Sequence, residues 1–290
     1  MLITSSIITG ISMGAMYGLL ALGYHITWSV SNTVNFSQGS SMMAGAVLGY
    51  TFAVVLGWPM FLAVPMAIAL CGVLGLGVEL FLVRPFVRKG SNGWLMATVA
   101  GGIVLDNLTL FTFGKEPRSF PSALAVEPIQ IFGAGVYPLQ LLIPAVGFAA
   151  ALLIGLASRR TMLGRVTLAV AQRPEAARIM GIDTGKVIAG SFALSGMFAG
   201  LAGILIAPLF NVSAGMGVLF GIKAFAAAIL GGITSAWGVM LAGLAYGLIE
   251  SLTTALLGST YTQIVSFSVI IAMLVVMPNG LLGRAAVNKV

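Results

Sequence analysis

Two acidic residues lie inside apolar stretches of the sequence, where an ionised carboxylate is costly. Asp106 lies within the run of residues 94–113, and Glu250 lies within the run of residues 238–257. Such an acid can relay protons, pair with a base or an amide, or hold helices together by hydrogen bonding. No opposite charge lies one helical turn from either acid, so any charged partner must come from another segment. We favour structural polar contacts over proton transfer for both residues.

Other chemistry-bearing residues are few. His25 is the sole histidine, and it is interpreted as a hydrogen-bonded anchor rather than a titrating group. The single cysteine, Cys71, excludes a disulfide framework or a thiolate metal cluster within the chain. The sequence has no zinc-protease motif, no credible catalytic triad and no G-x-x-x-x-G-K-[ST] phosphate loop. We therefore expect a chain that is not an enzyme, needs no cofactor or metal of its own, and does not hydrolyse ATP.

An uncharged, amide-rich stretch follows the first apolar run. Tyr24 to Ser41 read YHITWSVSNTVNFSQGSS, with Asn32, Asn35, Ser37 and Gln38 but no formal charge. Irregular backbone inside a bilayer is tolerated where it is buried in protein or lines a cavity. The stretch therefore favours either a path-lining segment with neutral hydrogen-bonding groups or a plain loop followed by a helix cap.

A second polar insert lies between two long apolar segments, at residues 168–182. Pro174 and Glu175 suit the first turn of a short helix, Arg178 suits its last turn, and Gly181 suits the residue just past its end. A membrane protein with a capped helix in a basic loop presents that helix to a partner in the water.

The elements that carry these residues are membrane-spanning helices. The 290 residues are 59% hydrophobic and 7% charged, whereas a soluble domain has about 25% charged residues. The apolar runs do not alternate as barrel strands do, so the expected fold is an all-α, polytopic bundle of eight or nine spans in a single domain, residues 1–290. The expected spans are residues 4–28, 39–57, 60–83, 94–113, 138–157, 188–208, 218–236, 238–257 and 261–277. The run at 218–236 is the weakest, because it contains Lys223 and a Gly-Gly pair.

The net charge of +7 fits cytoplasmic loops that obey the positive-inside rule better than it fits nucleic-acid binding. Most of the 14 Lys and Arg residues gather near residues 84–89, in the loop at about 158–187, and at Arg284 and Lys289. Both loops and the C-terminus are therefore expected in the cytoplasm, and the balanced loop at 114–137 is expected outside. The side of the N-terminus stays open, because it depends on whether there are eight or nine spans.

Glycine is unusually frequent, with 38 residues, against a usual share of about 7%. Many glycines recur four residues apart, which places them on one helical face and predicts close helix packing. These are Gly10, Gly14 and Gly18; Gly45 and Gly49; Gly196 and Gly200; and Gly243 and Gly247.

Four segments together resemble a known family. They are YGLLALGYHITWSVSNTVNFSQGSSMMAGA, AVAQRPEAARIMGI, GGITSAWGVMLAGLAYGLIES and MPNGLLG. Their combination resembles the permease subunits of bacterial ABC importers for branched-chain amino acids, the LivH type, from about residue 7 to residue 284. The basic residue that the family usually has before the final Pro-x-Gly is Met277 here.

The resemblance implies a permease fold of the type II-like importers and a role for each polar insert. The insert at 172–182 corresponds to the coupling helix that docks into an ATP-binding subunit. The residues that would make this contact are Gln172, Arg173, Pro174, Glu175, Ala176, Ala177, Arg178, Gly181 and Ile182. The amide-rich stretch corresponds to a broken helix near the translocation path, which makes Asn32, Asn35, Phe36 and Gln38 the candidate path-lining residues.

The resemblance also implies the partners and the location. These are a second, related permease chain, two ATP-binding cassette subunits that bind the ATP, an extracytoplasmic binding protein and membrane lipid, in the bacterial inner membrane. Alternatives remain: a permease for urea or short-chain amides, a secondary transporter driven by protons or sodium through Asp106, Glu250 and His25, or a channel without coupling.

Overall fold

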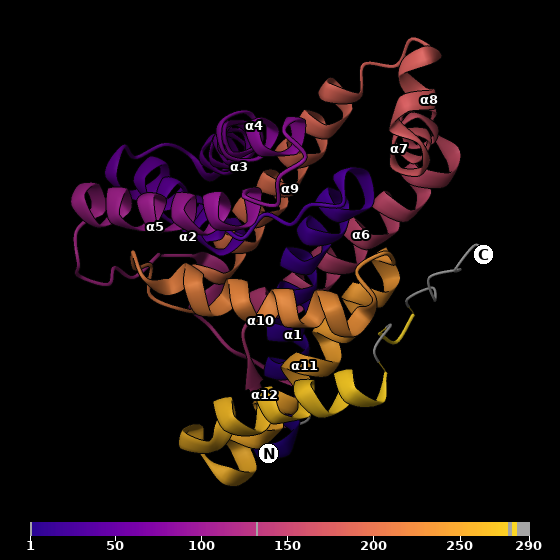
Figure 1. Cartoon of the computed structure of the whole chain (residues 1–290). Helices are drawn as coiled ribbons and strands as arrows, with labels where there is room; N and C mark the ends of the chain where they lie inside the picture. The colour runs from indigo at the N-terminus through magenta and orange to yellow at the C-terminus, as the bar shows by residue number, and fades with distance from the viewer. Residues whose placement is uncertain (1, 132, 278–279, 283–290) are drawn as a thin grey trace. The chain divides into compact units, whose positions relative to one another are not determined.

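The chain folds almost entirely into helices (Figure 1). The computed structural model describes residues 2–131, 133–277 and 280–282, so Arg284 and Lys289 lie outside the described residues, as do Pro278 and Asn279. The helices are α1 (Leu2–Ser31), α2 (Gln38–Tyr50), α3 (Met60–Gly77), α4 (Arg84–Arg88), α5 (Trp94–Phe113), α6 (Pro138–Arg160), α7 (Met162–Gln172), α8 (Pro174–Ile179), α9 (Thr184–Ile206), α10 (Met216–Gly231), α11 (Ala236–Leu257) and α12 (Ser259–Val276). Two π-helical segments, Thr51–Val55 and Val78–Val83, extend α2 and α3, and a 3-10 turn forms at Ala123–Ala125.

The all-α membrane bundle is confirmed, but the count of eight or nine spans is too high. Within the described residues, seven helices are long and apolar enough to cross a membrane. Of the two other expected spans, α10 has only 16 residues. The other, residues 39–57, is divided into the 13-residue α2 and a π-helical segment. The N-terminal turn of α2 carries Gln38, Ser40 and Ser41, which are buried in protein rather than facing lipid.

The chain forms two compact units, whose boundaries fall inside α1, the 3-10 turn at Ala123–Ala125, α6 and α10. The first unit contains residues up to His25, Leu124–Gly155, and the residues from Lys223 onward. In it, α1 packs on α11 through facing glycines. A methyl group added at Gly14 would lie 2.7 Å from the Gly243 carbonyl oxygen, and one added at Gly247 would lie 2.3 Å from the Gly14 nitrogen. Only glycine allows this approach of two backbones, as the spacing predicted.

The second unit contains Ile26–Ala123 and Leu156–Ile222, and α9 lies at its centre against α2 and α3. The glycines of this unit also lie against backbone atoms of neighbouring helices. A Cβ atom at Gly45 would lie 2.4 Å from the Gly200 Cα, and one at Gly196 would lie 2.3 Å from the Cys71 oxygen. The four-residue glycine spacing in this unit is therefore confirmed as a packing pattern.

The connections contain features that the sequence did not reveal. A short antiparallel hairpin joins β1 (Ile129–Ile131) to β2 (Ala134–Val136) in the first unit. In the second unit, Arg118 and Val212 exchange backbone hydrogen bonds of 2.9 and 2.8 Å. The Arg118 guanidinium lies over the Phe113 ring, 4.4 Å from its centroid, and donates to the Phe113 carbonyl oxygen. One cationic side chain thus fastens the loop after α5 to the end of that helix.

Residues 231–238, which contain the Gly-Gly pair, form a tight turn. Gly232 has a positive φ of 78°, and the Ser235 hydroxyl caps α11 by accepting a hydrogen bond from the Gly238 nitrogen. The turn directly joins α10 to α11 in the first unit.

Candidate functional site: a capped helix, a helix break and intramembrane ion pairs

The basic loop at residues 158–187, which includes the polar insert at 168–182, contains two helices, α7 and α8, rather than one. Thr161 ends the turn after α6 and caps α7 by accepting a hydrogen bond of 3.0 Å from the Gly164 nitrogen. A Cβ atom at Gly164 would lie 2.2 Å from the Ala157 carbonyl oxygen, so α7 leaves α6 through a very close turn. Helix α7 is the part of the insert that the sequence analysis missed.

Helix α8 has the termini that the sequence predicted. Pro174 is in its first turn with Glu175, and Arg178 is in its last turn. Gly181 follows with a φ of 83°; its nitrogen donates to the Arg178 oxygen, and the Ile182 nitrogen donates to the Ala177 oxygen. These two bonds form a Schellman motif, which ends a helix sharply and needs a left-handed residue at the position of Gly181.

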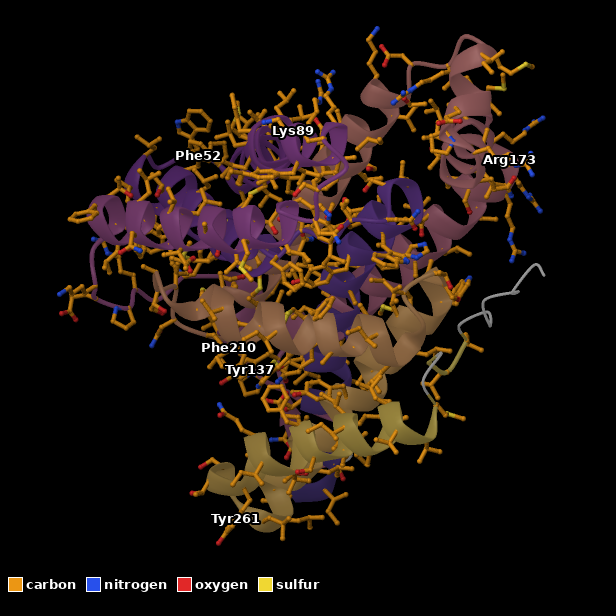
Figure 2. The ribbon with its side chains drawn as sticks, in the orientation of Figure 1. Phe52, Lys89, Tyr137, Arg173, Phe210 and Tyr261 are labelled. Carbon is orange, nitrogen blue, oxygen red and sulfur yellow. The ribbon has the colours of Figure 1, made fainter. Side chains whose placement is uncertain are left out.

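One face of α8 is anchored and the rest is open. Ala177 is buried in a small core with Val170 of α7 and Val30 of α1, and Ile182 packs against it. Arg173 is labelled at the junction of α7 and α8 in Figure 2. The exposed residues of the predicted contact set are Gln172, Arg173, Pro174, Glu175, Ala176, Arg178 and Gly181.

Two apolar side chains at the end of α8 were not predicted as contacts. Ile179 is 87% exposed and Met180 is 81% exposed. Large apolar side chains this exposed, beside exposed Glu175 and Arg178, are typical of a surface that receives a partner. A helical projection would have shown Ile179 on the side of α8 opposite Ala177, but not Met180, which follows the end of the helix three residues after Ala177.

Helix α8 is joined to the following span by a short, rigid link. Asp183 caps α9 by accepting from the Lys186 nitrogen at 3.2 Å, and it pairs with the Lys186 ammonium at 3.3 Å. The backbone hydrogen bond from Lys186 is the main cause that holds the pKa of Asp183 below its usual value. This cap therefore stabilises the helix start above the ordinary pKa of an aspartate and is lost as the pH falls through the lowered value. Arg178 adds a hydrogen bond of 2.9 Å to the Thr184 hydroxyl.

The amide-rich stretch forms a helix break, as the resemblance implied. Helix α1 ends at Ser31 and α2 begins at Gln38. Asn32 has a φ of 52°, and no other non-glycine residue that the structure describes has a positive φ. Asparagine tolerates this conformation better than most residues. Asn32 is exposed and Phe36 is partly buried.

Asn35 and Gln38 lie inside the second unit in a closed polar cluster. The side-chain Oδ1 atom of Asn35 accepts from the backbone nitrogen and the hydroxyl of Ser37, at 3.0 and 2.5 Å. The Gln38 amide donates to the Ser195 carbonyl oxygen and accepts from the Ser195 hydroxyl, both at 3.0 Å. These bonds tie the break to α9. The lining of a path by these residues stays a prediction.

Gln38→Met tests this cluster. The apolar side chain has a similar length but leaves the Ser195 hydroxyl and carbonyl without the amide. A buried polar group that loses its partner costs about 1–3 kcal/mol. We expect a lower unfolding temperature in detergent, with Gln38→Glu equally harmful because it buries a charge. An unchanged unfolding temperature in both variants would show that the cluster is not structural.

The intramembrane acids have different surroundings. Asp106 is half-buried on α5, where Ser40 of α2 is its hydrogen-bonding neighbour and its Oδ1 atom has no partner within the described residues. Ser40 lies in the first turn of α2, so Asp106 faces the start of that helix. Glu79 accepts two hydrogen bonds from Arg84, at 2.9 and 2.7 Å, in a bidentate pair.

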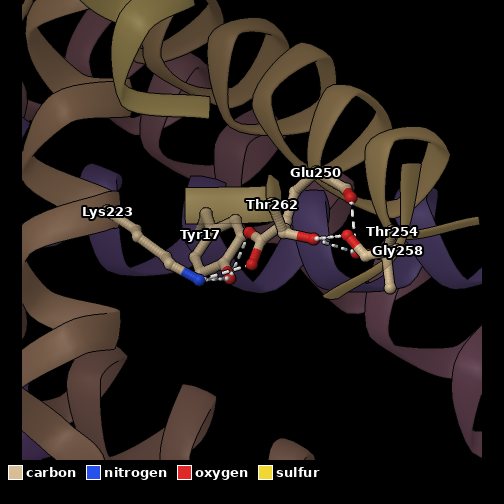
Figure 3. Close-up of polar contacts among 6 residues, drawn as sticks. All are labelled: Tyr17, Lys223, Glu250, Thr254, Gly258 and Thr262. Atoms are coloured by element: carbon tan, nitrogen blue, oxygen red, sulfur yellow. Dashed lines mark hydrogen bonds and ion pairs between the residues drawn. The ribbon is translucent and has the colours of Figure 1, made fainter. Parts of the chain in front are cut away.

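Glu250 has a charged partner, and this partner comes from another helix, as predicted for any partner that it has. Figure 3 shows Lys223 of α10 and Tyr17 of α1 converging on its carboxylate, all within the first unit. Lys223 pairs with Oε1, and the Tyr17 hydroxyl donates to Oε2 at 2.8 Å. The side chains of Lys223 and Glu250 are 9% and 15% exposed. In the sequence, Lys223 only weakens the apolar run at 218–236, and no spacing rule joins it to Glu250.

His25 is hydrogen-bonded, as expected of an anchor. Its Nδ1 atom lies 2.7 Å from the Ile233 carbonyl oxygen in the turn between α10 and α11. Among the residues that the structure describes, no three His, Cys, Asp or Glu side chains are grouped to hold a metal ion.

Within the described residues, seven apolar helices long enough to cross a membrane define the class as a polytopic membrane protein. The family described as the branched-chain amino acid transport system permease component matches residues 6–274, so the chain belongs to this family.

Relatives agree with this assignment, and one solved structure has a similar fold. The chain is 32% identical to the high-affinity branched-chain amino acid transport system permease protein LivH of Escherichia coli, over 97% of this chain and 96% of that one. It is 29% identical to the protein BraD of Pseudomonas aeruginosa, over 98% and 97% of the two chains. It is 25% identical to the ribose import permease protein RbsC of Haemophilus influenzae, over 87% and 86%. A chain of PsaBC from Streptococcus pneumoniae has a similar fold, with a TM-score of 0.51 and 14% identity over 95% and 92%.

Proposed function

We propose that this chain is the membrane-spanning permease subunit of an ATP-driven importer for branched-chain or related aliphatic amino acids. The family and the relatives' names support the solute class. Since the chain has no phosphate loop, a partner must bind and hydrolyse the ATP, and this chain has no catalytic role. Its partners are two ATP-binding subunits, a second related permease chain, an extracytoplasmic binding protein and membrane lipid, in the bacterial inner membrane with the C-terminus in the cytoplasm.

The proposal rests on the packing of α8, which has one buried face and one exposed face. Its exposed surface, with Ile179 and Met180, is available to an ATP-binding subunit, while Ala177 packs on Val30 at the end of α1. Val30 lies directly before the helix break at residues 32–37. A movement of α8 would therefore be transmitted to the helix break through the buried contact of Ala177 with Val30. It would be transmitted to α9 through the Asp183 cap.

The ion pair of Glu250 favours this function over a proton-driven transporter. Both oxygens of the Glu250 carboxylate are engaged by protein groups of other helices, the Lys223 ammonium and the Tyr17 hydroxyl, as in a structural polar contact.

Reconstitution tests the function. The complex that co-purifies with this chain in mild detergent is placed in liposomes, with the binding protein outside and ATP inside. We expect saturable uptake of labelled leucine, isoleucine or valine that requires ATP, with no uptake of urea. Transport by the chain alone under a proton or sodium gradient would overturn the proposal.

A further inference from the structure

The start of α7 lies against the end of an apolar helix, within the second unit. Helix α6 ends at Arg160, and α7 begins at Met162 after one intervening residue. A Cβ atom at Gly164 would lie 2.2 Å from the Ala157 carbonyl oxygen, so the first turn of α7 touches the last turn of α6. Since α6 is long and apolar enough to cross a membrane, its last turn reaches the headgroup region, and the first turn of α7 lies there with it.

Two large apolar side chains in this first turn of α7 are open. Met162 is 72% exposed and Leu163 is 79% exposed. The other end of the helix is packed on protein, because Val170 is buried in the small core with Ala177 and Val30. The open start lies about 12 Å along the helix from Val170. It is therefore a surface separate from the part of α7 that packs on α8.

Three arginines flank the open apolar side chains. Arg159 and Arg160 are exposed in the last turn of α6, and Arg165 is exposed in the first turn of α7. Residues 156–172 contain no Asp or Glu. In the part of the chain that the structure describes, none of the three arginines forms an ion pair. The patch is therefore cationic and has not been neutralised by its own chain.

We propose that Arg159, Arg160 and Arg165 bind the headgroups of anionic phospholipids while Met162 and Leu163 enter the adjoining acyl-chain region. A helix with arginines beside exposed apolar side chains is typical of a segment that lies in the membrane surface. The guanidinium group donates paired hydrogen bonds to phosphate oxygens, and its apolar stem can lie along the acyl chains. Lipid is favoured over a protein partner because the patch adjoins the end of a span, where lipid is the surrounding solvent.

The consequence for transport rests on the proposed function, which places this loop in the cytoplasm and an ATP-binding subunit on α8. Helix α7 would be fixed at both ends, by lipid at Met162 and by the protein core at Val170. Helix α8, which follows it in the same unit, would then move against a helix held at the membrane surface.

Quenching by brominated lipids tests the contact in the whole complex without a transport assay. A fluorescent dye is attached at Leu163→Cys, with Cys71→Ser to remove the native thiol, and the complex is placed in nanodiscs that contain brominated phosphatidylglycerol or brominated phosphatidylcholine. We expect quenching by both lipids, with an association with phosphatidylglycerol that is at least about fivefold stronger. This is the factor that one cationic side chain contributes near an anionic surface.

A dye at Ile179→Cys on α8 is the matched control. Ile179 is 87% exposed, but it lies beyond the packed end of α7 and should be quenched little by either lipid. Replacing Arg159, Arg160 and Arg165 together by Gln should abolish the preference for phosphatidylglycerol and leave the quenching at residue 163, because the apolar contact remains. If this variant is not recovered from membranes, salt carries the test with the arginines intact. At about 1 M salt the screening length falls to about 3 Å, and the preference should fall with it.

A dye at residue 163 that neither lipid quenches would overturn the proposal, and so would equal quenching by the two lipids at low salt. Shielding of that dye by an ATP-binding subunit instead of by lipid would assign the surface to a protein partner and would also overturn it. Failure of ATP-dependent uptake in the unaltered complex would count against the proposed function alone, because the quenching requires no transport.

Discussion

Gly203→Ala should unfold the second unit at a markedly lower temperature, although it adds only one methyl group. That methyl would lie 2.0 Å from the Met42 carbonyl oxygen, and the next nearest atoms are also backbone atoms of α2. No side-chain rotation can relieve the clash, so α2 and α9 must separate. Overpacking costs about 1–3 kcal/mol and occasionally more, and we expect the upper end here, which corresponds to a loss of roughly 6–12 °C in the unfolding temperature.

Gly190→Ala is the matched control on the same helix. A Cβ atom at Gly190 would have no heavy atom within 4 Å. Alanine also has the higher helix propensity, so this variant should be neutral or slightly more stable.

The single cysteine makes the measurement specific to the second unit. Cys71 is buried on α3 against α9, so a thiol-reactive fluorescent dye reports when this packing opens on heating. Equal unfolding temperatures for Gly203→Ala and Gly190→Ala would show that the crossing of α2 and α9 is looser than the structure has it.

The glycine faces and the long spans could be predicted because both depend on local periodicity. A residue four positions along a helix returns to the same face, so the pairs Gly10 and Gly14 or Gly196 and Gly200 can be recognised without knowing the partner helix. The short helix α8 was predictable for a similar reason, since Pro174 and Gly181 act on the residues next to them.

The polar clusters could not be predicted, because their members come from distant segments. Gln38 meets Ser195 across 157 positions, and Tyr17 meets Glu250 across 233. In the sequence, Lys223 only weakened an apolar run, whereas in the structure its charge is compensated by Glu250. The number of spans was wrong because apolar composition does not distinguish a helix that crosses the bilayer from one that protein surrounds, as for α2.

Helix α7 was missed because its polar and apolar residues do not form a membrane-like run. Its start depends on the Thr161 cap and on the close approach of Gly164 to α6. Both are contacts within the turn, and a search for long apolar runs does not detect them.

Gly181→Pro should separate ATP hydrolysis from uptake in the assembled importer. Proline requires a φ near −65°, but Gly181 has a φ of 83° and its nitrogen donates to the Arg178 carbonyl oxygen. The substitution therefore removes a hydrogen bond and the left-handed turn that directs the chain from α8 into α9. Backbone strain of this kind costs about 1–3 kcal/mol, which would reduce the population of correctly seated α8 by roughly 5- to 150-fold.

The expected phenotype follows from where α8 lies. The spans are unaltered, so the protein should reach the membrane in normal amounts and the complex should still hydrolyse ATP, while leucine uptake per ATP falls at least about fivefold. Replacing Glu175 and Arg178 together by alanine should act in the same direction, since it removes two exposed contacts and the Arg178 bond to Thr184.

Gly90→Pro provides the control in the other basic loop. Gly90 has a φ of 64° and donates to the Val87 carbonyl oxygen, so proline imposes the same local strain there. If α8 transmits the movement, Gly90→Pro should keep its uptake per ATP while Gly181→Pro loses it. Equal coupling in the two variants would mean that α8 is only a loop element, and that the ATP-binding subunit acts on this chain through another surface.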